Sequence, residues 1–297
     1  MRCLYNLVNV SKKYKDQKQT KYALKDINLE LPEHGFISIV GESGSGKTTL
    51  LNILGGIDTP SSGQVIFNGI DFSKSQKVDD IRNSMISIIF QEYNLLGNYN
   101  VFDNISLGLE FQGVKDKEKI KSIVEEKLKI VGLEGYETRK IDTLSGGEKQ
   151  RVAIARALAK NSKVILADEV TSALDTKNSK DILDVLKKIS TGILVVLVTH
   201  NESYATIYSD KIIRIDKGYL DTKIHELSHE TMNASYTKLK ITPKFFFKNV
   251  VNNILHSKLS AIISFFTSLV LFTLFISVFS LSNYSLSTAY RKTFEKK

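Results

Sequence analysis

The chain is poor in cysteine, proline and tryptophan. Its 297 residues include three prolines, one cysteine and no tryptophan. The single cysteine, Cys3, excludes a disulfide within the chain and fits a reducing compartment. The N-terminus also lacks the uninterrupted apolar stretch and the small-residue cleavage site of a signal peptide. We therefore expect the first domain to stay in the cytoplasm.

A block of basic residues is missing as well, although positive charge is in excess. Lys and Arg number 41 against 32 for Asp and Glu, which gives a formal net charge of +9. These basic residues are spread along the chain, so no nucleic-acid partner is expected. Hydrophobic residues make up 42% and charged residues 25%, as in ordinary globular proteins. This composition argues against disorder and against a polytopic membrane protein.

Charge is absent from one long stretch, which runs from Leu259 to Leu281. A helix of this length reaches roughly 34 Å, enough to cross a hydrocarbon core about 30 Å thick. A buried core helix is the alternative, but such helices usually have shorter apolar runs. The stretch predicts one transmembrane helix over residues 259–281, in a protein of the cell membrane. Residues 282–297 would be an extracytoplasmic tail or the start of a further domain.

An amphipathic pattern precedes the uncharged stretch, over residues 243–258. Its apolar side chains recur at helical spacing, at Phe247, Val250, Val251, Ile254 and Leu255. Lysines that could contact lipid headgroups are Lys244, Lys248 and Lys258. The pattern predicts a helix in the membrane interface, with lipid as a partner. The alternative is a helix that packs against the first domain.

The rest of the chain alternates apolar runs with helical patterns, which predicts an α/β domain with a largely parallel sheet. Central strands buried on both faces are expected at residues 36–40, 163–168 and 193–200. The Asn68-Gly69 pair predicts a hairpin and so an antiparallel β portion. Residues 78–158 read as mainly helical. A polar segment then places the end of this domain at residue 225 and a linker at 226–242.

A glycine-rich motif follows the first predicted central strand. Gly41 to Thr48 reads GESGSGKT, which fits G-x-x-x-x-G-K-[ST], and a helical pattern comes next. Glycines let successive backbone N–H groups and the helix N-terminus face phosphate oxygens. Lys47 would supply charge at the β- and γ-phosphates, and the Thr48 hydroxyl would ligate Mg²⁺. The motif predicts a nucleoside triphosphate site.

Two acids end the second central strand, in the sequence VILADE. Asp168 could support Mg²⁺ through its water shell, and Glu169 could orient or deprotonate an attacking water. An acidic pair after a strand can also be a solvated loop. Its occurrence together with the phosphate motif favours the hydrolytic site.

Beyond the phosphate loop, five motifs, one of them the VILADE strand, occur in a fixed order. They are Gln91 in FQEYNLL, LSGGE at Leu144 to Glu148, the VILADE strand, SALD at Ser172 to Asp175, and His200 in VTHN. With the phosphate loop, this series resembles the ATP-binding cassette (ABC) family over most of residues 1 to 220. The resemblance implies a P-loop NTPase with a RecA-like parallel sheet, an antiparallel β portion and a helical subdomain, and it implies ATP hydrolysis with Mg²⁺.

The resemblance also implies roles for individual residues in a head-to-tail dimer. ATP would lie between the phosphate loop of one protomer and the LSGGE motif of a second copy, with Glu169, His200 and Lys47 catalytic. Thr48, Gln91 and Asp168 would form the metal site. The implied nucleotide contacts are Tyr14 stacked on adenine, Gly41, Glu42, Ser43, Gly44, Ser45, Gly46, Lys47, Thr48, Thr49, Ser145, Gly146, Gly147 and Glu148, with Tyr22 as a weaker candidate for the stacking residue.

One position departs from the family pattern, because Val170 stands where proline commonly follows the catalytic acid. Both carboxylates remain, so we expect activity to survive with a less rigid turn and an altered rate. Within the family, SGSGKTTLLNILGGIDTPSSG looks like the branch of macrolide exporters, lipoprotein-releasing ATPases and bacitracin-type peptide-resistance pumps. The C-terminal segment is similar to the start of an FtsX-like permease region.

Three functions are compatible with this resemblance. The first is the energy-coupling part of a membrane exporter or resistance transporter, working with a permease region or a partner membrane protein. The second is the ATPase of a regulatory membrane complex that controls cell-wall enzymes or senses peptides without transport. The third is a soluble type of ABC ATPase acting on DNA or ribosomes, against which the uncharged stretch argues.

Overall fold

The computed structural model describes residues 3–15, 20–72, 77–172, 174–221, 243, 247, 250, 251 and 266–278. The chain divides into two compact units, Met1–Ile241 and Thr242–Lys297. The finer division predicted from the sequence, with boundaries at 225, 242, 258 and 281, stays a prediction.

In the second unit, the described residues are helical. Residues 266–278 form a helix with exposed side chains, and Phe247, Val250 and Val251 are helical and exposed as well. The remainder of the predicted amphipathic helix (243–258) and of the predicted transmembrane helix (259–281) lies outside the described residues. Within the part of the chain that is described, no helix is both long enough and apolar enough to cross a bilayer. The single membrane span is therefore not supported.

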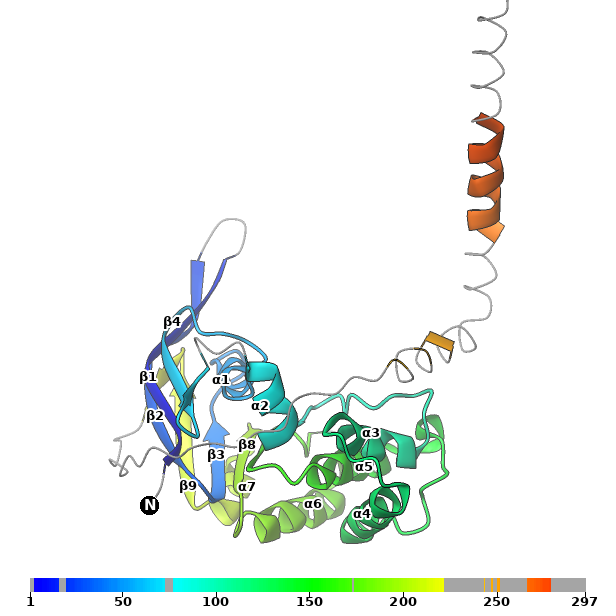
Figure 1. Ribbon diagram of the computed structural model, residues 1–297. Coiled ribbons are helices and arrows are strands. Elements are labelled where there is room, and N and C mark those ends of the chain that lie inside the picture. Colours follow the sequence, from blue (N-terminus) through cyan, green and yellow to red (C-terminus); the bar gives the residue numbers. More distant parts are fainter. Residues whose placement is uncertain are drawn as a thin grey trace, which may run out of the picture. The chain divides into compact units, whose positions relative to one another are not determined.

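The first unit contains a mainly parallel sheet whose strand order is β10-β9-β3-β8-β7-β6 (Figure 1). The strands are β3 (Gly35–Val40), β6 (Ile86–Ile89), β7 (Val164–Asp168), β8 (Leu194–Thr199), β9 (Lys211–Asp216) and β10 (Tyr219–Leu220). The three predicted central strands are confirmed as β3, β7 and β8, which are neighbours and run parallel. Their carboxyl ends therefore meet at one edge of the sheet.

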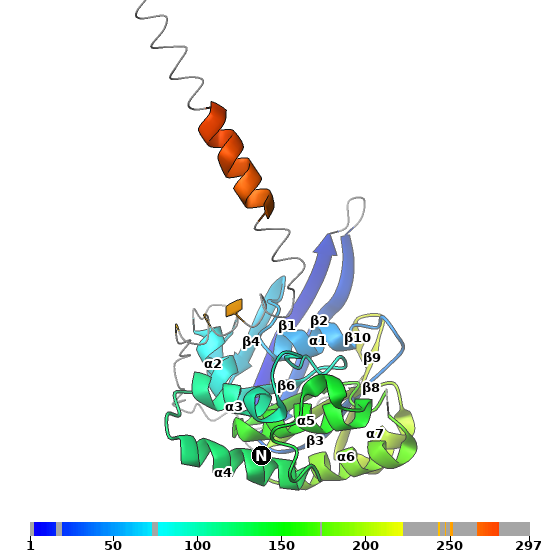
Figure 2. The ribbon, with the colours of Figure 1, turned by 90° about the vertical axis from the view of Figure 1, so that its right-hand side faces the viewer.

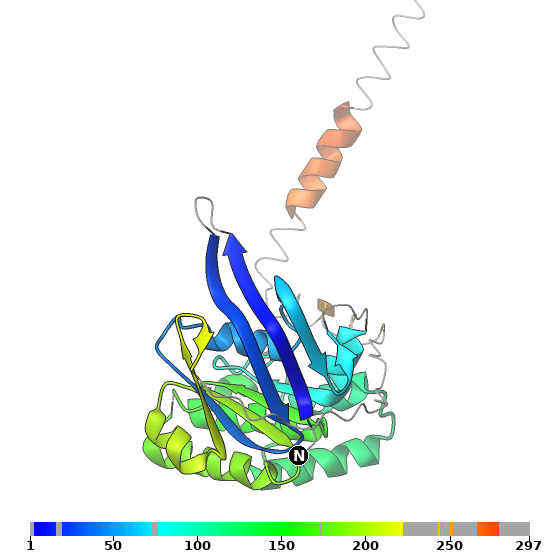
Figure 3. The ribbon, with the colours of Figure 1, turned by 90° about the vertical axis from the view of Figure 1, so that its left-hand side faces the viewer.

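A second, antiparallel sheet has the order β2-β1-β4-β5, with β1 between β2 and β4 (Figure 3). Its strands are β1 (Cys3–Lys15), β2 (Thr20–Pro32), β4 (Ser62–Phe67) and β5 (Ile70–Asp71). The predicted hairpin turn joins β4 to β5, where Asn68 and Gly69 have φ values of 49° and 78°. Positive φ at both central residues is what a tight type I′ hairpin requires.

Helices account for most of residues 78–158, as the sequence predicted. The helical elements of the unit are α1 (Lys47–Leu54), α2 (Val78–Met85), α3 (Val101–Phe111), α4 (Lys117–Ile130), the 3₁₀ turn η1 (Ile141–Thr143), α5 (Gly146–Ala159), α6 (Thr176–Ile189) and α7 (Glu202–Tyr208). Helix α5 packs against α3 and α4 to form a helical layer (Figures 1 and 2). Strand β6 interrupts this region, because its short sequence ISII pairs with β7 at the edge of the parallel sheet.

The parallel sheet separates two hydrophobic cores. Along β8, Val196 and Val198 join the core shared with the antiparallel sheet and α1, whereas Val195 and Leu197 join the core beneath the helical layer. Successive side chains of a strand point to opposite faces, so an apolar residue at every position serves both cores. This explains why the central strands are continuous apolar runs.

A partly buried lysine closes the C-terminal end of α5. The Lys160 ammonium donates hydrogen bonds to the carbonyl oxygens of Ile86 (2.7 Å) and Arg82 (3.2 Å), and it thereby ties α5 to α2 and β6. Burial lowers the pKa of Lys160 from 10.5 to about 8, and the charges of Arg82 and Arg156 act in the same direction. Protonation of Lys160 therefore destabilises the folded state relative to the unfolded chain.

We predict that Lys160 makes stability depend on pH between its folded pKa of about 8 and its usual pKa of 10.5. In this window the unfolded chain binds more protons at this position, so the free energy of unfolding rises with pH. Urea unfolding of the wild type and of Lys160→Met can be measured at both ends of this window. From the lower to the higher pH, the free energy of unfolding of the wild type should rise by about 1–3 kcal/mol more than that of the variant. A difference that is the same at both pH values would contradict this assignment.

Candidate functional site

The phosphate-binding loop lies between β3 and α1 and touches strands of both sheets. A Cβ atom on Gly41 would stand 2.2 Å from the carbonyl oxygen of Ile215 in β9, and one on Gly46 would stand 2.4 Å from that of Ala23 in β2. Gly46 also has φ 111° at the N-terminus of α1. Only glycine satisfies such contacts and such a backbone angle. The loop backbone is therefore fixed by packing as well as by its own turns.

Lys47 is the cation of this loop. Its side chain is buried, and its ammonium donates to the carbonyl oxygens of Gly41 (2.9 Å) and Glu42 (2.7 Å). The lysine thus folds back across the loop, at the start of α1. Lys47 is the first residue of α1, so the phosphate-binding loop carries a cation directly at a helix N-terminus.

A cavity of about 520 Å³ opens beside the loop. It collects half of the residues predicted to contact a nucleotide, and its lining comes from distant parts of the chain. Its lining residues are Tyr14, Lys21, Tyr22, Ala23, Ser43, Gly44, Gly46, Lys47, Thr48, Thr49, Gln91 and Glu169. The cavity joins a phosphate-binding loop at one side to tyrosine rings from β1 and β2 at the other.

Asp168 lies at the carboxyl end of β7, next to the loop. Burial raises the pKa of its carboxyl group and the charge of Glu169 adds to this, while a hydrogen bond from Thr48 and the charge of Lys47 act in the opposite direction. Its Oδ1 atom is buried and, among the described residues, has no hydrogen-bond partner. An acceptor oxygen left unpaired beside the Thr48 hydroxyl fits a hard cation such as Mg²⁺.

The predicted metal residues are Thr48, Gln91 and Asp168, and their role stays a prediction. Magnesium usually keeps several water ligands and takes one or two carboxylates together with substrate phosphates. Thr48 and Gln91 line the loop cavity, and Thr48 contacts Asp168. Within the described ranges there is no group of three His, Cys, Asp or Glu residues that could hold a metal ion.

Glu169 and His200 face each other across the carboxyl ends of β7 and β8. The Nδ1 atom of His200 lies 3.3 Å from Oε1 of Glu169. Glu169 has φ 45°, which is uncommon for a residue with a side chain and occurs preferentially at functional sites. Its side chain is 23% exposed and lines the loop cavity. The pair can therefore reach a water molecule held next to the loop.

The turn after Glu169 is closed without proline. Val170 is buried in the core below the helical layer. The amide and hydroxyl of Ser172 both donate to the Glu169 carbonyl oxygen, at 3.1 and 2.9 Å. The burial of Val170 and the hydrogen bonds of Ser172 stabilise this turn, which a proline ring would otherwise restrict. The predicted effect of Val170 on rate stays a prediction.

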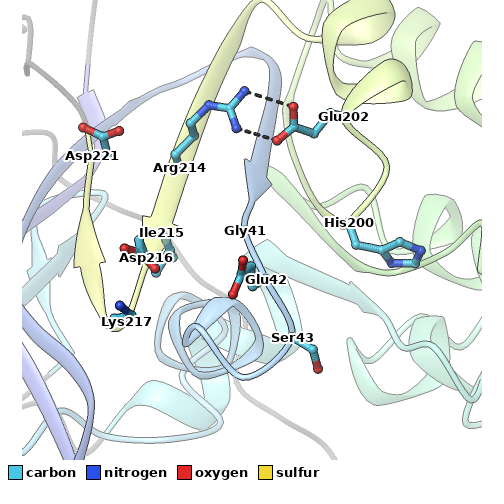
Figure 4. Close-up of a pocket in the computed structure, with 10 residues that line it drawn as sticks. All are labelled: Gly41, Glu42, Ser43, His200, Glu202, Arg214, Ile215, Asp216, Lys217 and Asp221. Carbon is cyan, nitrogen blue, oxygen red and sulfur yellow. Dashed lines mark hydrogen bonds and ion pairs between the residues drawn. The ribbon is translucent and has the colours of Figure 1, made fainter.

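A second cavity, of about 590 Å³, also borders the loop (Figure 4). It is lined by Gly41, Glu42, Ser43, His200, Glu202, Arg214, Ile215, Asp216, Lys217 and Asp221. Arg214 on β9 forms a two-pronged ion pair with Glu202 at the start of α7, as Figure 4 shows. The pair joins β9 to the segment that carries His200.

The LSGGE motif begins α5 and is held by side-chain hydrogen bonds. Glu148 Oε2 accepts hydrogen bonds from both the amide and the hydroxyl of Ser145, each at 2.8 Å, and Tyr136 donates to Glu148 Oε1 at 2.8 Å. These hydrogen bonds hold the pKa of Glu148 below its usual value, and the bond from the Ser145 backbone has the largest effect. Glu148 thus has a local role as the capping-box residue of α5.

The motif lines its own cavity of about 510 Å³, and none of the residues that line it also line the loop cavity. This third cavity contains Gly132, Leu133, Tyr136, Ser145, Gly146, Gly147, Glu148, Arg151, Leu174, Asp175 and Asn178. The structure therefore brings the predicted loop residues together but leaves Ser145 to Glu148 apart from them. Tyr136 and the Glu202–Arg214 pair were not predicted, because none of these three residues belongs to a motif and each lies 12 residues from its partner.

A protein-family profile described as "ABC transporter" matches residues 24–172. The spermidine/putrescine import ATP-binding protein PotA of Clostridium novyi (strain NT) is 43% identical over 239 residues, which is 78% of this chain and 67% of that protein. The macrolide export ATP-binding/permease protein MacB of Mannheimia succiniciproducens is 35% identical over 240 residues, 79% of this chain and 37% of that protein. This chain therefore spans about two thirds of the first relative and little more than a third of the second.

A shorter relative is covered almost completely. The uncharacterized ABC transporter ATP-binding protein MJ0796 of Methanocaldococcus jannaschii is 40% identical over 228 residues, 73% of this chain and 95% of that protein. Two solved dimeric structures of MJ0796 match with a TM-score of 0.70, covering 73% of this chain and 97% of theirs. One of them is described as a post-hydrolysis state bound to ADP and Pi.

We predict that the Ser145 cap stabilises α5. Replacing Ser145 by Ala removes the acceptor for the Glu148 amide and a donor to its carboxylate, and it should lower the free energy of unfolding by about 1 kcal/mol. Ser145→Thr keeps the hydroxyl and should lose less. Urea unfolding of the three proteins checks this. Equal stability of Ser145→Ala and the wild type would show that the cap contributes nothing.

Proposed function

The chain belongs to the ABC transporter family and is an ATPase, and we propose that it hydrolyses ATP within a head-to-tail dimer to power transport across a membrane. The observation that carries this proposal is the contact between Glu169, which lines the loop cavity, and His200, which lines the second cavity beside the same loop; the two side chains are 3.3 Å apart. It supplies a base, and a group that orients the base, beside a phosphate site.

The proposed roles of the residues follow from their positions. Lys47 and the backbone N–H groups of Gly44 to Thr48 bind the β- and γ-phosphates. The Glu169 carboxylate accepts the proton of the attacking water, and His200 holds that carboxylate and contacts the γ-phosphate. Tyr14 stacks on the adenine ring at the far side of the same cavity. The water attacks the γ-phosphorus, and ADP leaves as phosphate is formed.

Magnesium belongs to the proposal as well. Thr48, Asp168 and Gln91 would hold the ion and its water shell, and the unpaired Oδ1 atom of Asp168 supports this placement. When bound, the ion would neutralise negative charge on the phosphate oxygens.

A second copy of the chain would complete the site. Ser145, Gly146 and Gly147 lie at the N-terminus of α5 and line a cavity apart from the phosphate loop. Backbone N–H groups at a helix N-terminus attract anions, so these residues are suited to a γ-phosphate held by a partner protomer. The dimeric structures of MJ0796, one with ADP and Pi, support this arrangement.

We further propose that the transport is export through a permease region. The macrolide relative is named as an ATP-binding and permease protein in one chain, and the match covers the minor part of it. In the present chain the ATPase unit is likewise followed by more sequence, which includes the uncharged stretch from Leu259 to Leu281. That stretch stays the proposed membrane anchor on sequence grounds alone. Other relatives are named as import proteins, so direction needs its own experiment.

We predict that Glu169→Gln stops turnover while ATP still binds. The amide cannot accept the proton of water, so the hydrolysis rate should fall at least about 100-fold. With ATP, the variant should accumulate as a dimer in size-exclusion chromatography with light scattering. Hydrolysis at the parent rate would show that Glu169 is not the base.

Lys47→Ala is the matched control for that experiment. This variant loses the cation of the phosphate loop, so it should bind ATP weakly and stay monomeric with ATP. If it bound ATP as tightly as the wild type, the phosphate site would be assigned to the wrong loop.

We predict that the direction of transport is outward. Inverted membrane vesicles that contain the protein with its permease region should accumulate a labelled macrolide when ATP is added, because the ATPase side then faces the medium. Vesicles with Glu169→Gln should not. ATP-dependent loss of the macrolide from preloaded inverted vesicles would instead indicate import.

A further inference from the structure

The Tyr14 ring at the rim of the loop cavity is held by Asp58, a residue that is not among the predicted site residues. The hydroxyl of Tyr14 donates a hydrogen bond to Oδ2 of Asp58 at 2.9 Å. The other oxygen, Oδ1, accepts from the ammonium of Lys12 and from the amide of Thr59, the latter at 2.8 Å. Lys12 also donates to the Thr59 carbonyl oxygen at 2.8 Å and lies 5.2 Å from the centre of the Tyr14 ring.

Asp58 is itself fixed to the helix that begins with Lys47. The amides of Ile57 and Asp58 donate to the carbonyl oxygen of Asn52 in α1, at 2.9 and 3.2 Å. Helix α1 thus carries Lys47 at its N-terminus and, just beyond its C-terminus, the carboxylate that anchors Tyr14. The position of the ring is set from the same helix as the position of the phosphate-binding cation.

The charge of Asp58 suits this role. Its burial acts to raise its pKa, but hydrogen bonds from Lys12 and Tyr14 outweigh that effect and hold the pKa below its usual value. The carboxylate is therefore ionised at neutral pH, and a hydrogen bond from a tyrosine hydroxyl to an ionised acceptor is stronger than one between neutral groups.

The neighbouring ring, Tyr22, is placed differently. Two lysines approach it, Lys13 at 4.7 Å and Lys25 at 5.7 Å from its centre. Tyr14 and Tyr22 are about equally exposed, at 46% and 42%. The anchor through Asp58 favours Tyr14 over Tyr22 as the ring that is pre-positioned for a flat ligand.

We propose that Asp58 is a positioning residue for the nucleotide base: it fixes the Tyr14 ring at the cavity that contains the phosphate loop, so that the ring is already in place when ATP arrives. The inference rests on the proposed function, because it requires a nucleotide in this cavity. Fixing a side chain before binding reduces the conformational entropy lost on binding, so Asp58 contributes to affinity without touching the ligand.

The test compares ATP with inorganic tripolyphosphate, which has the phosphates but no base. Asp58→Ala should raise the Kd for ATP about three- to tenfold, the effect of one lost hydrogen bond, and should leave the Kd for tripolyphosphate unchanged. Tyr14→Phe, which keeps the ring, should weaken ATP binding to a similar extent. In steady-state assays KM should rise while kcat stays within about twofold.

A double-variant cycle shows whether Asp58 acts through the ring. In a Tyr14→Ala background, Asp58→Ala should have no further effect on ATP binding, because there is no ring left to position. A second tyrosine–aspartate pair, in which Tyr208 donates to Asp184 at 3.0 Å, lies away from the loop cavity and serves as the matched control. Tyr208→Phe and Asp184→Ala should not change the Kd for ATP.

Two results would overturn the inference. One is an unchanged Kd for ATP in both Asp58→Ala and Tyr14→Phe. The other is an equal loss of ATP and tripolyphosphate binding, which would mean that Asp58 supports the phosphate loop through α1 and not the base. Failure of the proposed function looks different, because the wild-type protein would then bind neither ligand. If Asp58→Ala does not fold, the Kd values of Tyr14→Phe for ATP and for tripolyphosphate still test the inference.

Discussion

The backbone of the phosphate-binding loop runs so close to its neighbours that two of its residues can carry no side chain. Gly41 meets the carbonyl oxygen of Ile215 in β9, and Gly46 meets that of Ala23 in β2. These two strands belong to different sheets. The loop is therefore the junction at which both sheets meet, and it also receives a hydrogen bond from the Gly218 amide to the Ser45 carbonyl oxygen. The location of every other group in the site follows from that junction.

The parallel sheet brings the remaining polar groups to the loop. Strands β3, β7 and β8 are adjacent and parallel, so the loop, the Asp168–Glu169 pair and His200 all follow strand ends at one edge. Ligands of such sheets bind outside the carboxyl ends of the strands. The antiparallel sheet contributes Tyr14 from another direction, and β6 leads directly to Gln91. The cavity is thus assembled by topology, from segments that share no local sequence.

Much of this arrangement could be predicted because its signals are local. The continuous apolar runs of β3, β7 and β8 indicate strands buried on both faces, and Asn68-Gly69 indicates a hairpin turn. Strand β6 was missed, because an apolar run as short as Ile86–Ile89 has no period that separates a strand from a helix. The anchoring of Tyr14 by Asp58 could not be predicted either. The pair is 44 residues apart and becomes a contact only when β1 and α1 are placed together.

The hydrogen bonds of Lys47 bear on what happens after the chemistry. Its ammonium is buried, and it donates to two carbonyl oxygens of its own loop. A buried cation that lost its phosphate partner without replacement would cost several kcal/mol, of the order expected for an uncompensated charge. In this loop, the carbonyl oxygens of Gly41 and Glu42 are the replacement partners. Lys47 therefore keeps two hydrogen-bond partners in its own loop when phosphate leaves, so no unpaired charge opposes release of the product.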